Sequence, residues 1–224
     1  MEIDLKKYPK PQRIRPHIAP NHYFKYNKLN PDLEFYPPVY KDIDWKTYFK
    51  DNKPPQNLDI GCGMGGFLLE SANENIHQNY LGIEVRKAPV QWIQSVIDGE
   101  SILNCAVLNY SVVNGLPFIE NQSINHIYYF FPDPWFKKRH KKRRAFNLDF
   151  LNECHRVMMS DGTLFLQTDI EEVHNYHIET LLESEKFNFE ELTNLDNWLL
   201  KETDQEKICN KANFPFWKLI CTKK

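Results

Sequence analysis

The chain has 224 residues, of which 42% are hydrophobic and 26% are charged, and its formal net charge is −2 at pH 7. This length suits one domain with a sizeable core, plus extensions. No stretch approaches the roughly 18 apolar residues of a membrane-spanning helix. The N-terminus includes Glu2 and Asp4 and lacks the apolar segment of a signal peptide. We therefore expect a cytoplasmic protein with no membrane association.

The cysteines lie far apart and form no Cys-x-x-Cys pair; they are Cys62, Cys105, Cys154, Cys209 and Cys221. An odd, scattered set argues against a disulfide framework and against a zinc site, so we expect buried, reduced thiols. His174 and His177 lie three residues apart on an expected helix, but no third ligand is near them in the sequence. We therefore expect no metal site.

Residues 1–55 differ in composition from the rest of the chain. They contain nine of the fourteen prolines and no glycine. Proline removes backbone hydrogen-bond donors and disfavours helical geometry at the preceding residue. We interpret residues 1–55 as a proline-rich N-terminal arm with a short helical turn at 45–49, and residues 56–224 as the folded domain.

From residue 57 onward, strand patterns alternate with helix patterns. Strands are expected at 58–60, 80–84, 102–108, 124–131 and 163–168, helices at 66–75, 87–98, 147–159 and 171–186, and a last strand or hairpin at 214–222. Alternation of this kind predicts an α/β fold with a mostly parallel sheet and helices on both faces.

A glycine-rich loop connects the first expected strand to the first helix, with Gly61, Gly63 and Gly65 in alternate positions. Glycines there permit a tight turn and let a ligand approach the backbone closely. Glu84 ends the next strand, 21 residues after Gly63. A carboxylate at that position can accept hydrogen bonds from both hydroxyls of an adenosine ribose.

The carboxylate that precedes this loop, Asp59, discriminates between two cofactors. Gly61, Gly63 and Gly66 also satisfy the dinucleotide pattern G-x-G-x-x-G. However, a carboxylate two residues before the first glycine would repel a pyrophosphate and attract the ammonium of a methionine moiety. We therefore predict S-adenosylmethionine as the cofactor; a glycine-rich turn without a ligand is the alternative.

Asn109 follows the third expected strand, at the sheet edge where open α/β folds bind ligands. Its amide suits a hydrogen bond to adenine, and it equally suits the cap of a helix. Both interpretations remain open.

Asp133 stands between Pro132 and Pro134 at the end of the fourth expected strand, and Trp135 follows. The prolines leave this carboxylate little conformational entropy to lose. A rigid carboxylate beside an aromatic ring suits holding a flat base that donates hydrogen bonds. The alternative is a proline-stiffened turn with a solvated aspartate.

Residues 137–144 hold seven Lys or Arg and no acid, whereas residues 171–206 hold eleven acids and two lysines. A basic run is often a solvated face or a targeting signal. Its place after the fourth strand favours contact with nucleic-acid phosphates. Arg13 and Arg15 in the arm either contact the same polyanion or are solvated.

The segment 130–135, together with Lys137, Arg139, His140 and residues 142–144, resembles the signature of tRNA (guanine-N7)-methyltransferases. The resemblance extends over about residues 57–206. It includes residues 59–65, 82–85, the Thr168-Asp169 pair and a Thr-x-x-Glu motif at 203–206.

This resemblance implies a Rossmann-like class I methyltransferase fold, S-adenosylmethionine as cofactor and a guanosine of the tRNA variable loop as substrate. It implies that the cofactor is lined by Asp59, Glu84, Asn109 and Asp133, and that the guanosine is contacted by Lys137, Asp169, Thr203, Asp204, Gln205 and Glu206. We assign the tRNA phosphates to Arg139, Lys142, Arg143 and Arg144.

The chain departs from the family pattern at several positions. Asp59 stands where glutamate is frequent, and Asn109 replaces a common aspartate. Ile170 stands where tryptophan is frequent, and Gln205 where an aromatic residue is usual. The Arg- and Gly-rich residues that commonly follow the Thr-x-x-Glu motif are missing from 207–214.

Guanine N7 carries a lone pair and no proton, so its methylation needs no general base. We therefore expect Asp133 to orient the base and to stabilise the positive charge of the product. The alternatives are a methyltransferase that acts on another RNA or base, and a non-catalytic RNA-binding protein with the same fold. Monomer and homodimer both remain open.

Overall fold

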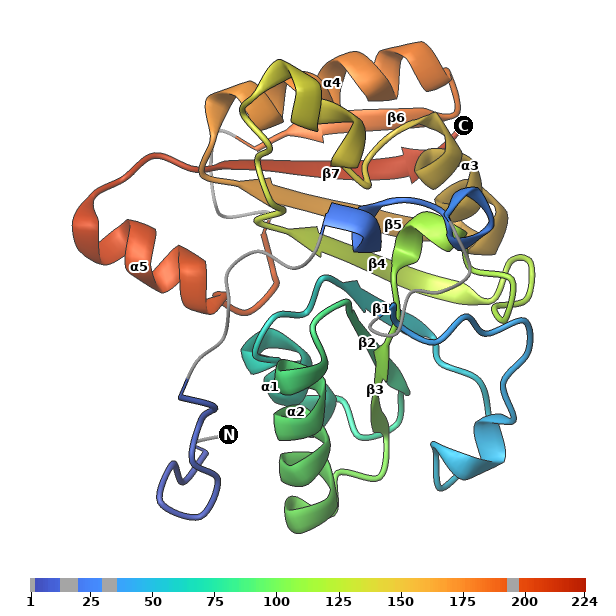
Figure 1. Cartoon of the computed structure of the whole chain (residues 1–224), viewed down its shortest axis with the longest axis vertical. Helices are drawn as coiled ribbons and strands as arrows, with labels where there is room; N and C mark the ends of the chain where they lie inside the picture. Colours follow the sequence, from blue (N-terminus) through green and yellow to red (C-terminus); the bar gives the residue numbers. More distant parts are fainter. Residues whose placement is uncertain (1–2, 13–19, 30–35, 193–197) are drawn as a thin grey trace.

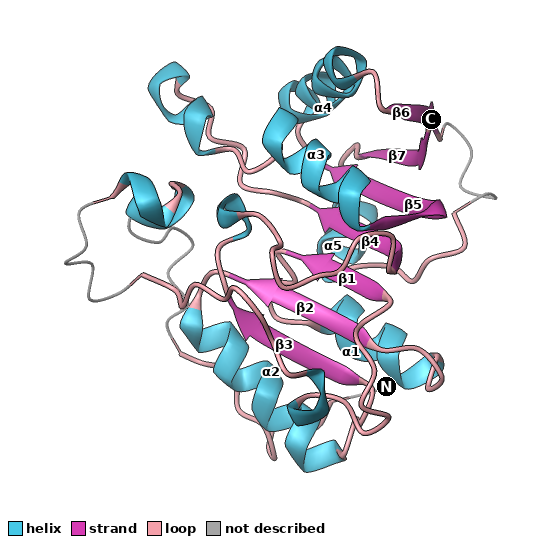
Figure 2. Ribbon diagram, turned by 90° about the vertical axis from the view of Figure 1, so that its right-hand side faces the viewer, coloured by secondary structure: helices cyan, strands magenta, loops and turns pink. Residues whose placement is uncertain are grey.

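A computed structural model describes residues 3–12, 20–29, 36–192 and 198–224, and one sheet of seven strands forms its centre (Figures 1 and 2). The strands are β1 Asn57–Ile60, β2 Tyr80–Glu84, β3 Cys105–Asn109, β4 Ile124–Phe130, β5 Met158–Thr168, β6 Phe187–Glu191 and β7 Trp217–Lys223. Their order is β3-β2-β1-β4-β5-β7-β6. β1 to β5 are parallel, whereas β7 runs antiparallel to both β5 and β6.

The helices are α1 Gly66–Glu74, α2 Lys87–Glu100, α3 Leu148–Val157, α4 Glu171–Ser184 and α5 Asp204–Ala212. Successive residues of a strand point to opposite faces of the sheet, which creates two apolar layers. Leu68 of α1 and Ile93 of α2 belong to one layer, and Phe150 of α3 and Leu181 of α4 belong to the other. The mostly parallel α/β fold is thereby confirmed.

The N-terminal arm contributes to this core. The expected turn at 45–49 is a 3-10 helix, η3 Trp45–Thr47, and the neighbouring side chains Ile43 and Phe49 are buried. These two side chains join the apolar layer that also contains Phe150 and Leu181, to which β2 and β3 contribute as well. On the chain after β3, only a single 3-10 turn forms, η4 Val112–Asn114. The arm therefore covers a part of the sheet that an α-helix covers elsewhere. The division at residues 55 and 56 stays a prediction.

The expected elements match with small shifts, except at the C-terminal side. β5 begins directly after α3 and is five residues longer at its start than expected. β3 begins at Cys105, because Leu103 and Asn104 form a turn. β6 and α5 were not predicted. Within the described residues, no helix is long and apolar enough to cross a membrane. Four cysteines are buried as expected, and Cys62 is half-buried.

The strand order reverses between β1 and β4, which are neighbours although β2 and β3 lie between them in sequence. In open α/β sheets a crevice forms at such a point, outside the carboxyl ends of the strands. The fold therefore places a ligand site where β1, β2 and β4 end.

Candidate active site

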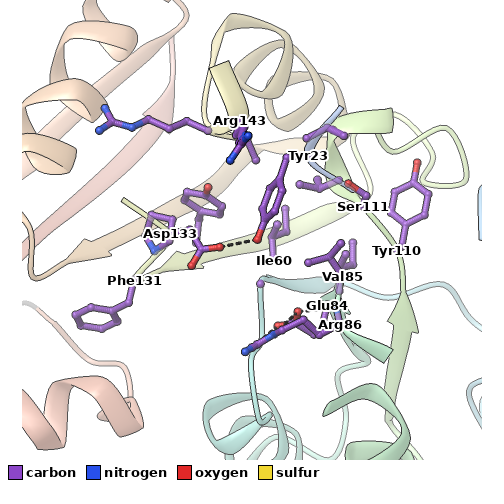
Figure 3. A pocket seen from close by; sticks show the side chains of 18 of the residues that line it. Tyr23, Ile60, Glu84, Val85, Arg86, Tyr110, Ser111, Phe131, Asp133 and Arg143 are labelled. Atoms are coloured by element: carbon purple, nitrogen blue, oxygen red, sulfur yellow. Dashed lines mark hydrogen bonds and ion pairs between the residues drawn. The ribbon is translucent and has the colours of Figure 1, made fainter. Parts of the chain in front are cut away.

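A cavity of about 350 Å³ lies at this position. Its walls come from the ends of β1, β2 and β4, the segment after β3, the Asp133 loop and the arm (Figure 3). Glu84 and Asp133, predicted from distant parts of the sequence, line this one cavity together with Gly61 and Arg143. Tyr23 of the arm and Arg86 also line it, and neither was predicted.

The glycine loop has the backbone geometry that its composition predicts. Gly61, Gly63 and Gly65 have φ values of 81°, 57° and 73°, in the left-handed region that favours glycine. Gly65 is the N-cap residue of α1, and a Cβ atom there would lie 2.8 Å from Cγ1 of Ile93. The loop therefore requires glycine both for its turn and for the approach of α2.

Asp59 is buried at the start of this loop, with 4% of its surface exposed. Its Oδ2 atom has no hydrogen-bond partner among the residues that the structure describes. Burial, and next the charge of Glu84, raise the pKa of Asp59 to about 8. A buried carboxylate that lacks a partner cation is suited to the ammonium of a methionine moiety, so the site fits the predicted cofactor.

Glu84 is held by Arg86, two residues later. Its Oε1 accepts from the backbone N of Arg86 at 2.9 Å and from Nε at 3.0 Å. Its Oε2 accepts from Nη2 of Arg86 at 3.0 Å and from the backbone N of Gly63 at 3.1 Å. Oε2 therefore faces the glycine loop, whereas Oε1 faces Arg86, and a ribose in the cavity would share the carboxylate with the guanidinium of Arg86.

Asn109 anchors the turn after β2. Its Nδ2 donates to the carbonyl oxygen of Glu84 at 3.1 Å and to that of Val85 at 2.9 Å. The N-cap residue of the following turn is Ser111, so the helix-cap alternative for Asn109 is wrong. The contact with adenine stays a prediction.

Asp133 lines the cavity, and its Oδ2 accepts a hydrogen bond of 2.7 Å from the hydroxyl of Tyr23 (Figure 3). The ring of Tyr23 meets Trp135 edge to face, with 4.7 Å between the ring centroids. Phe131 and Trp135, which flank the two prolines, have positive φ values of 47° and 44°. Such conformations cost on the order of 1 kcal/mol each in residues other than glycine, so tertiary contacts must hold this loop.

Arg144 supplies such contacts. Its Nε and Nη2 atoms donate to the carbonyl oxygen of Pro134 at 3.0 and 2.7 Å, and Nη2 also binds Glu172 of α4 at 2.8 Å. The guanidinium lies 4.8 Å from the ring centroid of Tyr176, and the side chain is 4% exposed. Arg144 therefore points into the protein, away from any phosphate outside it.

The other side chains of the basic run differ in how exposed they are. Most of the run forms a 3-10 helix, η5 Lys138–Arg143. Lys137, Arg139 and Lys142 are exposed, as phosphate contacts require. Arg143 is half-buried, and its guanidinium lies 4.9 Å from the ring centroid of Trp135. Arg13 and Arg15 lie outside the described residues.

The Thr-x-x-Glu motif forms the start of α5. The Oγ1 of Thr203 accepts from the backbone N of Glu206 at 3.1 Å, and Glu206 accepts in return from the backbone N of Thr203. This is a capping box, which satisfies backbone donors at a helix start. Glu206 also forms a buried ion pair with Lys218 at 2.5 Å and accepts from Gln167 at 3.0 Å.

The remaining two residues of this motif point elsewhere. Gln205 donates to Asp169 at 2.9 Å, so the structure brings two predicted substrate residues together. The carboxylate of Asp204 lies next to Gly66 at the start of α1. None of residues 169 and 203–206 lines the cavity.

Comparisons with known proteins identify the family of this chain. A family model described as a putative methyltransferase matches residues 53–219. The chain is 36% identical to the tRNA (guanine-N(7)-)-methyltransferase of Prochlorococcus marinus strain MIT 9515, over 62% of this chain and 68% of the relative. It is 34% identical to the enzyme of the same name in strain MIT 9215, over 74% of this chain and 81% of the relative.

Solved structures with low sequence identity share the fold. An antibiotic-related methyltransferase superposes with a TM-score of 0.58 at 16% identity, covering 84% of this chain and 96% of that one. A 16S rRNA methyltransferase, KamB, gives a TM-score of 0.56 at 12% identity, covering 80% and 90%. The expected Rossmann-like class I methyltransferase fold is confirmed. The chain belongs to the S-adenosylmethionine-dependent tRNA (guanine-N(7)-)-methyltransferase family.

Proposed function

We propose that this protein transfers a methyl group from S-adenosylmethionine to N7 of a guanosine in tRNA, in the variable loop. The observation that carries this proposal is that Glu84, at the end of β2, and Asp133, after β4, line the same cavity. A cofactor held at one end of that cavity is thereby within reach of a base held at the other.

The chain's own residues divide the task of binding the cofactor. Asp59 would hold its ammonium, Glu84 would accept from its ribose, and Asn109 would support the turn beside the adenine. Gly61, Gly63 and Gly65 would allow close approach of the backbone. When bound, the cofactor supplies a sulfonium methyl group as the electrophile.

At the base, the protein has to position the guanine and to stabilise the charge that develops on it. The guanine N7 lone pair would attack the methyl carbon as the carbon–sulfur bond breaks, with S-adenosylhomocysteine as the leaving group, and no proton has to be removed first. The methylated base is a cation, so the carboxylate of Asp133 would stabilise the positive charge that develops on the ring. Trp135 offers an aromatic surface beside it.

Two further sets of residues are candidates for contact with the tRNA, the exposed basic residues after β4 and the residues around the start of α5. We assign the phosphates to Lys137, Arg139 and Lys142, which are exposed, and we reassign Arg144 to holding the Asp133 loop. Lys137 also stays a candidate for contact with the guanosine, as do Asp169 and residues 203–206. For Thr203 and Glu206, such contact would require the capping box of α5 to open.

The test is incubation with unmodified tRNA and methyl-labelled cofactor, followed by aniline cleavage, which cuts the chain at N7-methylguanosine. We expect label transfer and one cleavage site in the variable loop. Label without cleavage would indicate another acceptor atom. Binding of tRNA without affinity for labelled cofactor in equilibrium dialysis would indicate a non-catalytic RNA-binding protein.

A further inference from the structure

The arm reaches the active site through residues 20–29, which we call the strap. It consists of two 3-10 turns, η1 Pro20–Tyr23 and η2 Tyr26–Lys28. Two contacts hold it over the segment that follows β3, and a third ties it to α3. Ser111 Oγ donates to the carbonyl oxygen of His22 at 2.6 Å, the backbone N of Tyr26 donates to Asn114 at 2.8 Å, and Lys25 pairs with Asp149 at 2.7 Å.

These anchors place one strap side chain inside the cavity. The hydroxyl of Tyr23 points at the carboxylate of Asp133, and Tyr23 lines the cavity together with Asp133 and Ser111 (Figure 3). Burial, and next the charge of Asp133, raise the pKa of Tyr23, so the phenol stays protonated and donates. The two residues are 110 positions apart in the sequence, so the contact depends on the anchored strap.

We propose that Tyr23 is a positioning residue for methyl transfer: its hydroxyl fixes the orientation of the Asp133 carboxylate beside the base. This inference rests on the proposed function. Asp133 lies on a loop, where a carboxylate without a partner samples several rotamers. The hydrogen bond from Tyr23 selects one of them, and the edge contact with Trp135 keeps the tyrosine ring in place.

The role differs from that of a group that binds tRNA. A positioning residue raises the rate of the bound complex and leaves affinity almost unchanged, because it acts on the geometry of the reacting groups. One hydrogen bond to a charged group corresponds to roughly tenfold to a hundredfold in rate.

The experiment compares Tyr23→Phe with the wild type in single-turnover methylation at saturating tRNA and cofactor. We expect the rate to fall roughly tenfold or more, with the Kd of tRNA, the Kd of the cofactor and the unfolding temperature unchanged. Tyr26→Phe is the matched control: it removes a hydroxyl from the same strap, and its ring contacts Tyr36 and not Asp133. We expect that control to keep the wild-type rate.

A second comparison tests whether Tyr23 acts through Asp133. In the Asp133→Ala background, Tyr23→Phe should cause no further loss, because the acceptor that its hydroxyl orients is gone. The proposal would be overturned if the two substitutions reduced the single-turnover rate independently, so that their effects multiplied in the double variant. It would also be overturned if Tyr23→Phe left the rate unchanged or raised it, or if weaker tRNA binding explained the loss. If the wild type yields no aniline-sensitive product, the proposed function fails; if the wild type is active and Tyr23→Phe equals it, only the role of Tyr23 fails.

Discussion

The raised pKa of Asp59 makes cofactor binding a proton-coupled event. With a pKa of about 8, Asp59 is mostly neutral in the free protein at pH 7, about nine molecules in ten being protonated. The ammonium of the cofactor favours the ionised carboxylate and lowers this pKa. Binding at pH 7 should therefore release up to roughly one proton per site.

The same linkage fixes how affinity changes with pH. Below the free-state pKa, each pH unit should increase affinity up to about tenfold, so between pH 5.5 and 7 the gain is up to about thirtyfold. The cofactor amine stays largely protonated in this range. Asp59→Asn removes the titrating group. This variant should bind more weakly at pH 7 and show little pH dependence.

Calorimetry with S-adenosylhomocysteine, which carries the same ammonium, measures this directly. Titrations at pH 7 in buffers of different ionisation enthalpy give the number of protons released. We expect close to one for the wild type and close to none for Asp59→Asn. A wild-type binding enthalpy that is the same in every buffer, together with affinity flat from pH 5.5 to 7, would refute the placement of the ammonium at Asp59.

The pKa of Asp59 also affects the stability of the cofactor-free protein. The folded pKa exceeds the ordinary value of 3.8, so the folded state binds more protons than the unfolded state between about pH 4 and 8, and stability falls as pH rises through this window. Between pH 5.5 and 8 the loss is about 3 kcal/mol. His177, whose pKa burial lowers to about 3, acts with the opposite sign. Only the difference between wild type and Asp59→Asn in denaturant unfolding therefore isolates Asp59.

Other predictions concern the loop, the basic run and α5. Asp133→Ala should lose most single-turnover activity while cofactor affinity falls modestly; unchanged turnover would exclude its role. Arg144→Lys, which cannot form both bonds to the Pro134 carbonyl, should slow methylation more than it weakens tRNA binding, and the reverse result would make Arg144 a phosphate ligand. Arg139→Ala should weaken tRNA binding and reduce the salt-dependence slope by about one, with saturated turnover kept. Glu206→Gln should destabilise the fold by about 3–5 kcal/mol in denaturant unfolding, because it leaves the Lys218 charge buried and unpaired; unchanged stability would contradict the structural role.

The parts of the fold that the sequence predicts best are those with local signals. β2 matches at both ends because its five residues are all buried, a turn at 76–77 precedes it and a bend at Val85 follows it. β6 was missed because its second half carries Glu190 and Glu191 at a sheet edge, where charged side chains are tolerated. α5 was missed because residues 203–206 were interpreted as a family motif, although Thr-x-x-Glu is also a helix-start signal.

The functional site shows the same difference between residues that have a local sequence signal and residues that have none. Glu84 ends β2 and Asp133 follows β4, and they line one cavity because the carboxyl ends of parallel strands meet at one sheet edge. The inward orientation of Arg144 had no sequence signal, since a buried arginine and an exposed one look alike within a basic run. Arg86 had one: a cation two residues after Glu84 can reach back to its carboxylate.

The arm shows most clearly why the remainder could not be predicted. Its prolines and lack of glycine indicate an extended segment, and no periodicity indicates where such a segment packs. Its position depends on complementary partners far away in sequence, namely Ser111 and Asn114 for the strap and the face beside β3 for Phe49. The segment between β3 and β4 forms one 3-10 turn and leaves room for the arm. The arm therefore completes both the core and the wall of the active site, so removing it should expose the sheet and release Asp133 together.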